Sequence, residues 1–350
     1  MKILHVIDNL GGGGAERLLY DLCRVAPSSE TIEILLLSQK NNVYLNEIIN
    51  LGIRVTISPY AMKSLKNIGF IRDFVKKNQF DIVHAHLFPA FYFVAYACKK
   101  LSVKLVVSEH VTENSRSKWY FRKIENGVYK NYAKVICVSS AVKEAIIKRH
   151  LFLKDRAEVI ANGIDIDRFK VSQTKENYFV MVARLCQQKN HITLLKAMQS
   201  FPEYKLLLIG TGPLEEMLKS EVETLGLKKQ VEFIGYIPDI TEYLSKAKLS
   251  ILTSDWEGFG IIAVESMASG TPFVCSDIHV LKEVVGDAGV LFKKGDAEEL
   301  SEKISHLLSN EAEYRVLIDK GFERVKEFDI RKTAMNYEAV YRNLLSNKGR

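Results

Sequence analysis

The sequence predicts an α/β protein with two domains, each built around a parallel sheet that helices cover on both faces. Short apolar runs alternate with helical patterns along the chain, which is the order that βαβ units produce. The alternation runs through two series that a polar stretch separates, and a length of 350 residues favours two domains over one.

The first series contains seven predicted strands, with helical patterns between most of them. The strands are expected at Ile3–Ile7, Ile32–Leu37, Ile53–Ile57, Ile82–His84, Leu105–Val107, Val135–Val138 and Glu158–Ile160. The helices are expected at Ala15–Ala26, Val43–Leu51, Lys66–Lys77, Pro89–Leu101, Trp119–Tyr132 and Ala141–Arg149. Short apolar strands that helices separate are typical of a parallel sheet that is buried on both faces.

The polar stretch Lys170–Asn177 lacks a strand pattern and is the predicted linker. After it, strands are expected at Phe179–Val182, Leu206–Ile209, Val231–Ile234, Leu249–Leu252, Phe273–Cys275 and Val290–Phe292, with helices such as His191–Ser200, Leu214–Leu225 and Ala297–Leu308. We expect Rossmann-like domains at 1–170 and 177–328 that face each other, and a helix at 330–346 that returns to the first. Ligands of such sheets bind beyond the carboxyl ends of the strands, so the ligand is expected in a cleft between the domains.

The composition bears on the cellular compartment of the protein and on the kinds of metal or disulfide site that it can contain. The five cysteines are scattered without close pairs, which argues against disulfides and a thiolate metal site and favours a reducing cytoplasm. The first residues lack the pattern of a signal peptide. The longest apolar run, Leu87–Cys98, is shorter than the ~20 residues of a membrane span, so a buried helix is expected. We expect a cytoplasmic protein that is a monomer or a weak dimer.

The net charge of +7 fits either a solvated surface or attraction to an anionic lipid surface or substrate. The segment Arg116–Lys123 mixes basic and aromatic residues, as membrane-interfacial segments do. Peripheral contact with an anionic membrane, on its inner face, therefore stands beside the solvated-surface interpretation. No recognised nucleic-acid-binding motif occurs, so nucleic acid is not an expected partner.

Two glutamates, Glu257 and Glu265, are separated by a glycine-rich stretch and an apolar run. The glycines disfavour one continuous helix. We place Glu257 on a loop and Glu265 in a helix that begins near Gly260 and ends at residues 270–272. The amides of residues 260–262 then point out of a helix N-terminus, where an anion can bind. Two carboxylates around an anion site suit a phosphorylated ligand that is rich in hydroxyl groups.

Other predicted strands of the second domain also end in loops that suit a ligand. Arg184 and Lys189 follow the first of these strands, and two cations at a strand end suit a diphosphate. The alternative is an exposed charge run. The loops Gly210–Leu214 and Gly235–Pro238 end the next two strands, and they either hold a nucleobase through backbone groups or are simple turns.

Glycines 11–14 follow the first strand of the first domain and precede a helix, so the backbone there can approach an anion closely. The pattern is neither a dinucleotide fingerprint nor a P-loop, and a plain tight turn is the alternative. His110 follows the fifth strand in a polar cluster. We place it in the cleft, with a capping or turn histidine as the alternative.

Two patterns bear on metals. His84 and His86 point to the same side of an extended segment, but no suitable further ligands lie near in sequence, so no metal site is expected. Asp165 and Asp167 match the DxD pattern of metal-dependent sugar transferases. Their position directly after a strand is better explained by a turn.

Several motifs occur together in one order along the chain. They are Gly13-Gly14-Ala15-Glu16-Arg17, His110 at its strand end, Val159–Asp165, Arg184 with Lys189-Asn190, Gly210 with Gly212-Pro213-Leu214, and Glu257 with Glu265. In these motifs the chain resembles glycosyltransferase family 4, the retaining nucleotide-sugar transferases of GT-B architecture. The resemblance runs from residue 1 to about residue 290. Ala161 departs from the pattern, since relatives often have proline there.

The resemblance implies a role for each matching residue. Arg184 and Lys189 would grip the donor diphosphate, and Glu265 would bond the nucleotide ribose. Glu257 would hold hydroxyls of the transferred sugar, with backbone amides from Phe259, Gly260 and Ile261. Gly13 and Gly14 would lie near the phosphates and the acceptor, His110 beside the sugar, and Gly212 and Ile237 in the donor site, with the Ile237 backbone at the base.

The implied partners are a nucleotide-sugar donor and a glycan or lipid-linked acceptor, and no metal or other cofactor is implied. UDP-sugars are the expected donors, ahead of GDP-mannose, and cell-surface polysaccharide biosynthesis is the expected role. His110, Glu257, Arg184 and Lys189 would be the catalytic residues.

Two other functions stay open. A nucleotide-sugar epimerase or hydrolase would convert the donor without an acceptor, and a catalytically silent protein would bind the donor without transferring its sugar. A glycosidase that uses Glu257 and Glu265 is disfavoured, because the two carboxylates would face different parts of a phosphate pocket rather than flank one bond.

Overall fold

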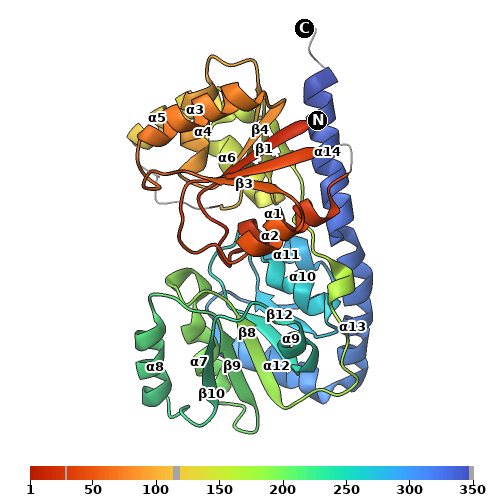
Figure 1. Ribbon diagram of the computed structural model, residues 1–350. Helices are drawn as coiled ribbons and strands as arrows, with labels where there is room; N and C mark the ends of the chain where they lie inside the picture. The colour runs from red at the N-terminus through yellow and green to blue at the C-terminus, as the bar shows by residue number, and fades with distance from the viewer. Residues whose placement is uncertain (28–29, 113–118, 347–350) are drawn as a thin grey trace. The chain divides into compact units, whose positions relative to one another are not determined.

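The computed structural model describes residues 1–27, 30–112 and 119–346, and the chain divides into two compact units (Figure 1). Unit 1 contains Met1–Gly163 and Ile330–Arg350, and unit 2 contains Ile164–Asp329. The division falls ahead of the predicted linker at 170–177. The reason is that Ile164 already pairs within unit 2, where its amide donates to the carbonyl of Phe328 at 2.8 Å.

The described residues of unit 1 form a seven-stranded sheet in the order β3-β2-β1-β4-β5-β6-β7. Its strands are β1 (Lys2–Ile7), β2 (Thr31–Leu36), β3 (Arg54–Ile57), β4 (Ile82–His86), β5 (Lys104–Glu109), β6 (Lys134–Cys137) and β7 (Ala157–Val159). All of these strands pair in parallel, as predicted. The other elements are α1 (Gly14–Val25), α2 (Leu45–Asn50), α3 (Lys66–Asn78), α4 (Ala90–Cys98), α5 (Trp119–Tyr129), α6 (Ser140–Arg149) and the 3-10 helix η1 (Leu151–Leu153).

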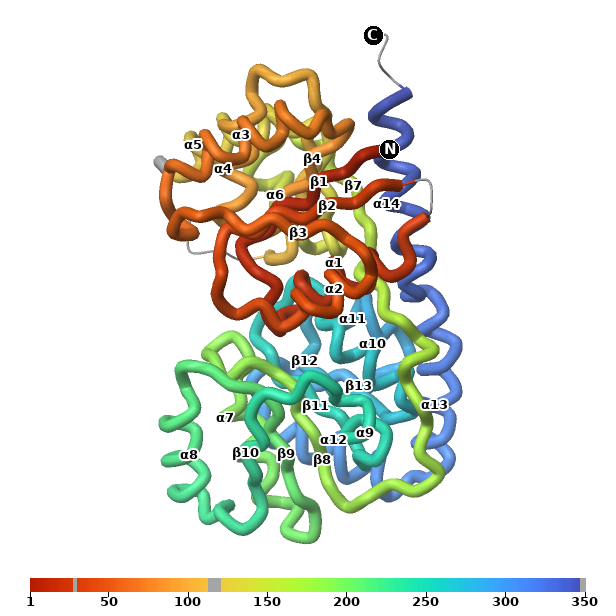
Figure 2. The backbone as a smooth tube through the Cα atoms, in the orientation of Figure 1, coloured from red at the N-terminus to blue at the C-terminus, as the bar shows by residue number. Residues whose placement is uncertain are grey.

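Helix α14 (Ile330–Ser346) completes unit 1 from the far end of the chain. It runs beside α1 (Figure 2). Its residues Ile330, Tyr337 and Tyr341 are buried in one apolar cluster with Ile3 of β1 and Leu18 of α1. The helix therefore covers part of a sheet that would otherwise be exposed.

The described residues of unit 2 form a six-stranded parallel sheet in the order β10-β9-β8-β11-β12-β13 (Figure 2). Its strands are β8 (Tyr178–Val182), β9 (Lys205–Ile209), β10 (Val231–Gly235), β11 (Leu249–Leu252), β12 (Phe273–Ser276) and β13 (Gly289–Phe292). The helices are α7 (His191–Met198), α8 (Glu215–Thr224), α9 (Thr241–Lys246), α10 (Ile261–Ala268), α11 (His279–Val285), α12 (Ala297–Ser309) and α13 (Glu311–Val325), with 3-10 helices η2 (Ile166–Arg168), η3 (Gln187–Lys189) and η4 (Lys326–Phe328). Both units are Rossmann-like, which confirms the predicted fold class.

Each sheet has one point at which successive strands are added on the opposite side. This point lies between β1 and β4 in unit 1 and between β8 and β11 in unit 2. Loops on either side of such a point diverge, which leaves room for a ligand at the carboxyl ends of the strands.

The apolar run at 87–98 contains α4, most of whose residues are buried, so the predicted buried helix is confirmed. Within the described ranges, no helix is both long and apolar enough to cross a membrane.

Candidate functional site

In unit 2, the loops that follow β8 and β11 lie at the switch point of the sheet, because these two strands pair with each other. The loop after β8 carries Arg184 and η3, which ends at Lys189. The loop after β11 carries Glu257. Three predicted site residues from two separate segments therefore lie at the edge where parallel sheets bind ligands.

Glu257 lies on a loop, as predicted, and its side chain is 6% exposed. Its Oε1 oxygen accepts a hydrogen bond from Ser254 Oγ at 2.7 Å and from the Nζ ammonium group of Lys189, which is 18% exposed. A carboxylate that is removed from water needs a partner of opposite charge, and Lys189 supplies it. The cation that we assigned to a diphosphate thus also compensates the carboxylate that we assigned to a sugar.

Arg184 differs from Lys189 in its surroundings. It is exposed, and within the described part of the chain its guanidinium has no hydrogen-bond or ion-pair partner. Its five N–H donors are therefore available to a ligand, and their planar arrangement matches phosphate oxygens.

The helix that carries Glu265 begins at a glycine that cannot easily be replaced. Gly260 precedes α10 with φ of 82°, and a Cβ atom built there would lie 2.5 Å from Leu281 Cδ2. Both observations exclude a side chain at this position without strain. Helix α10 starts at Ile261, so its first amides point out of the helix N-terminus, and the predicted placement of Glu265 within a helix is confirmed.

The loop after β9 packs directly onto the loop after β8. The Leu185 amide donates to the carbonyl of Thr211 at 3.1 Å, and the Leu214 amide donates to the carbonyl of Leu185 at 3.0 Å. A Cβ atom on Gly212 would overlap the Leu185 carbonyl, so this close approach requires glycine. Gly212 therefore has a structural reason to be glycine, beside the ligand role that the resemblance implies.

Two other predicted donor-site residues are buried or half-buried. Phe259 is 5% exposed, and its ring packs edge-on against that of Phe328, with centroids 5.6 Å apart. Ile237 is half-buried and follows β10.

In unit 1, the glycine loop follows β1, and Gly13 is the N-cap of α1. The Glu16 carboxylate folds back onto this loop, because a Cβ atom on Gly13 would lie 2.5 Å from Glu16 Oε2. Burial raises the pKa of Glu16 to about 7, and the negative charge of Asp8 adds to this rise. Burial also raises the pKa of Asp8. Sequence reasoning missed this pair, although acids on both sides of a glycine run were a visible signal.

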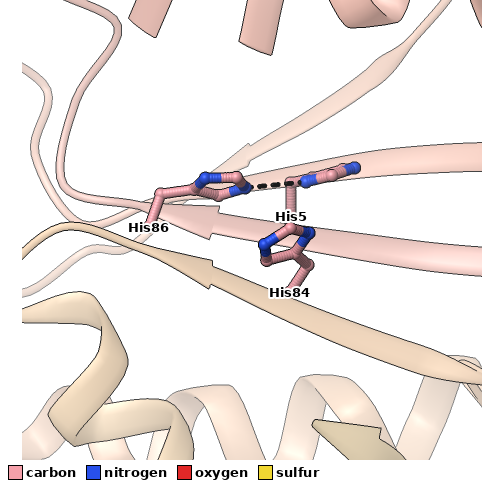
Figure 3. A group of neighbouring side chains, drawn as sticks. All are labelled: His5, His84 and His86. Atoms are coloured by element: carbon pink, nitrogen blue, oxygen red, sulfur yellow. Dashed lines mark hydrogen bonds between the residues drawn. The ribbon is translucent and has the colours of Figure 1, made fainter. Parts of the chain in front are cut away.

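Three histidines stack inside unit 1 (Figure 3). His84 and His86 lie on β4, and His5 joins them from the neighbouring strand β1. His5 Nδ1 and His86 Nε2 share a hydrogen bond of 2.9 Å, and ligand nitrogens of all three rings lie within 4.8 Å of one another. The sequence showed only two of these residues as neighbours, because His5 is far from them along the chain and reaches them only through the pairing of β1 with β4.

The arrangement is nevertheless a stack rather than a chelate. The rings of His84 and His86 lie 4.2 Å apart at an interplanar angle of 25°. An imidazole binds a metal through a lone pair in its ring plane, so nearly parallel stacked rings do not aim at one ion. Both ring nitrogens of His84 are also engaged, with Tyr341 Oη at 2.6 Å and Ser108 Oγ at 2.9 Å.

His110 directly follows β5, at the same sheet edge as the glycine loop. Its Nε2 atom is buried and has no hydrogen-bond partner among the described residues. Burial lowers its pKa to about 4, so the imidazole is neutral at pH 7. A neutral imidazole offers one donor and one acceptor to a ligand.

Two remaining sequence patterns are placed as follows. Asp165 immediately precedes the 3-10 turn η2, in which Asp167 lies, so the turn interpretation of the DxD match is confirmed. Of the basic–aromatic segment, residues 116–118 lie outside the described residues, and α5 begins at Trp119.

Two family models match consecutive parts of the chain. "Glycosyltransferase Family 4" matches residues 12–168, and "Glycosyl transferases group 1" matches residues 164–324. An uncharacterized glycosyltransferase of Methanocaldococcus jannaschii is 29% identical over 88% of each chain. The UDP-Gal:alpha-D-GlcNAc-diphosphoundecaprenol alpha-1,3-galactosyltransferase of Escherichia coli is 26% identical over 77% of this chain and 78% of its own.

Among solved structures, Anabaena HepE in complex with UDP-glucose matches with a TM-score of 0.87, 21% identity and 99% coverage of each chain. An identity this low shows the fold alone. That likeness confirms the predicted GT-B fold class.

Proposed function

Because the chain belongs to the glycosyltransferases that the group 1 and family 4 models describe, we propose that it moves a sugar, with retention, from a UDP-sugar to a glycan or lipid-linked acceptor. The observation that carries the proposal is the charged group at the unit 2 switch point, where Lys189 pairs with Glu257 and Arg184 stands exposed. The names of the Escherichia coli galactosyltransferase and of the HepE complex support a uridine donor, and the former supports a lipid-linked acceptor.

In this proposal, unit 2 binds the donor. Arg184 and Lys189 stabilise the charge that develops on the departing diphosphate, together with the amides at the start of α10. One cation about 4 Å from a phosphate charge contributes about 4 kcal/mol at intermediate dielectric, before desolvation is subtracted. Glu257 and Glu265 accept hydrogen bonds from hydroxyls of the sugar and of the ribose.

For unit 1, we propose that the backbone at Gly13 and Gly14 approaches the phosphates and the acceptor. His110 contacts the transferred sugar as a neutral hydrogen-bonding group, since its pKa is lowered to about 4. The protein's own cations supply the charge at the diphosphate, so no metal or other cofactor is needed. The enzyme would act in the cytoplasm in cell-surface polysaccharide biosynthesis, with peripheral contact at the inner face of an anionic membrane.

Arg184 provides the sharpest test, because its side chain is exposed and its loss should leave the fold intact. A screen of nucleotide sugars, with and without acceptor and chelator, first identifies the donor. Arg184→Gln should then lower kcat/KM by about 100-fold, as expected for a charged contact in the transition state, at unchanged thermal stability. Arg315→Gln, which removes another exposed arginine of unit 2, is the matched control.

Wild-type kcat/KM in Arg184→Gln would contradict the assignment. Strict dependence of turnover on a metal would contradict the metal-free mechanism. Donor conversion without any acceptor would favour an epimerase or hydrolase, and donor binding without turnover would favour a silent binding protein.

A further inference from the structure

Two adjacent hydroxyl side chains follow β11, and both are fully buried. Thr253 and Ser254 each have 0% exposure, although neither takes part in a strand. A buried hydroxyl group needs a partner, and the partners of these two belong to different parts of the site.

Thr253 holds the loop that carries Lys189. Its Oγ1 donates toward the backbone carbonyls of Lys189 at 3.0 Å and of Asn190 at 2.9 Å. Asn190 adopts φ of 45°, a left-handed conformation that is unfavourable for most residues other than glycine. The Thr253 hydroxyl therefore fixes the backbone at the point where the chain reverses after Lys189.

Ser254 holds the carboxylate instead. Its Oγ donates to Glu257 Oε1 at 2.7 Å, the same oxygen that Lys189 contacts. Two donors on one carboxylate oxygen fix the orientation of the carboxylate group more strictly than one donor. When Lys189 turns toward a phosphate, the Ser254 hydroxyl remains to keep Glu257 in place.

The backbones of the two loops are joined by further hydrogen bonds. The Asp255 amide donates to the Gln188 carbonyl at 2.8 Å, and Gln188 Nε2 donates to the Trp256 carbonyl at 2.8 Å. Asn190 Nδ2 donates to Asp255 Oδ1 at 3.0 Å. These bonds hold the loops together, so removing one hydroxyl should disturb the group it orients rather than separate the loops.

We infer that Thr253 and Ser254 are positioning residues with separate tasks: Thr253 orients Lys189 for the donor diphosphate, and Ser254 orients Glu257 for the transferred sugar. The inference rests on the proposed function. In it, one of two neighbouring hydroxyl groups supports recognition of the donor diphosphate and the other supports recognition of the sugar. A purely structural role for Ser254 would lower the affinities for UDP and UDP-glucose equally, and for Thr253 the conservative variant Thr253→Ser tests whether the hydroxyl group itself is needed.

Calorimetry with UDP and UDP-glucose separates these tasks, because UDP lacks the sugar. In Ser254→Ala, the affinity for UDP should stay within about twofold, while the affinity for UDP-glucose and kcat/KM fall about tenfold. In Thr253→Val, which keeps the shape and removes the donor, both affinities should fall about tenfold. Where the donor screen selects a guanosine nucleotide, GDP and GDP-mannose replace this pair.

Ser250→Ala is the matched control, since Ser250 lies on β11 with 0% exposure and its hydroxyl accepts a hydrogen bond from Ser266 at 2.8 Å. It should lower stability without changing either affinity. If Thr253→Val does not fold, Thr253→Ser keeps the hydroxyl and should bind both ligands like the wild type.

Equal losses of UDP and UDP-glucose affinity in Ser254→Ala would overturn its separate task, as would the same loss in Ser250→Ala. Weak UDP binding by Thr253→Ser would overturn the task of Thr253. If the wild type is active and the variants bind UDP and UDP-glucose like the wild type, the inference is overturned but the proposed function is not. If the wild-type chain binds no nucleoside diphosphate, the proposed function is overturned.

Discussion

Mild acid is expected to destabilise unit 1, because its stacked histidines and His110 are held as neutral rings. Burial lowers the pKa of His5 and of His110 from 6.5 to about 4. Burial also holds the pKa of His84 and of His86 well below 6.5, and a proton on one ring would repel a proton on the next. At pH values between about 4 and 6.5, these histidines bind protons in the unfolded chain that they do not bind in the folded chain.

The free energy of unfolding therefore falls as the pH falls below about 6.5. Each such histidine removes about 2 kcal/mol between pH 7 and pH 5, and all four remove about 8 kcal/mol. Glu16 acts in the opposite direction, since burial raises its pKa to about 7 and its protonation in the folded state returns about 2 kcal/mol. The remaining loss is about 6 kcal/mol before the opposing contribution of Asp8, whose pKa burial also raises, and it is a large share of the total stability of a typical domain.

Hydrogen exchange of the β1 and β4 amides at pH 7 and pH 5, corrected for intrinsic rates, measures this loss within unit 1. His5→Gln keeps a polar group opposite His86 but does not titrate, so it should reduce the acid loss by about 2 kcal/mol. Glu16→Gln removes the opposing titration and should enlarge the loss by about 2 kcal/mol. The reasoning is refuted if both variants keep the pH dependence of the wild type.

Two further predictions concern unit 2. Lys189→Met should lower the free energy of unfolding by about 3 kcal/mol, because it leaves Glu257 buried without its cation, and adding Glu257→Gln should restore most of this loss. Urea unfolding measures both variants, and equal stability of the single and double variants would show that the pair is not coupled. Gly260→Ala should cost about 2 kcal/mol more than Gly295→Ala and should weaken UDP binding. The two glycines have φ of 82° and 79°, but only the first would bring a Cβ atom against Leu281. Equal losses of stability in these two variants would show that the Leu281 side chain moves aside without a measurable cost in free energy.

The strands could be predicted closely from the sequence, because their apolar runs end at glycine or polar residues. Leu249–Leu252 was predicted with the bounds that the structure shows, and so was the terminal helix at 330–346. The bonds that hold α14 could not be predicted. Tyr341 bonds His84 across 257 positions of sequence and Tyr337 bonds Ser108 across 229, and no local pattern encodes such contacts.

In the candidate site, too, contacts between residues that are distant in the sequence could not be predicted. The sequence indicated Lys189 and Glu257 separately, through strand ends and a helix start. Their ion pair spans 68 positions and depends on β8 and β11 being neighbours. Strand order also explains why His5 was missed, since β1 and β4 pair although α1, β2, α2, β3 and α3 lie between them in the chain.

The two switch points share one topology but differ in their electrostatics. In unit 2, Arg184 is an exposed permanent cation on the loop that also carries Lys189, which pairs with Glu257. In unit 1, the histidine rings and His110 are neutral at pH 7, and the pKa of Glu16 of about 7 leaves its carboxyl group only partly ionised. The exposed guanidinium suits phosphate oxygens at the end of β8, whereas the neutral imidazole of His110 suits uncharged hydroxyl groups at the end of β5. The exposed cation supports our proposal that unit 2 holds the donor diphosphate.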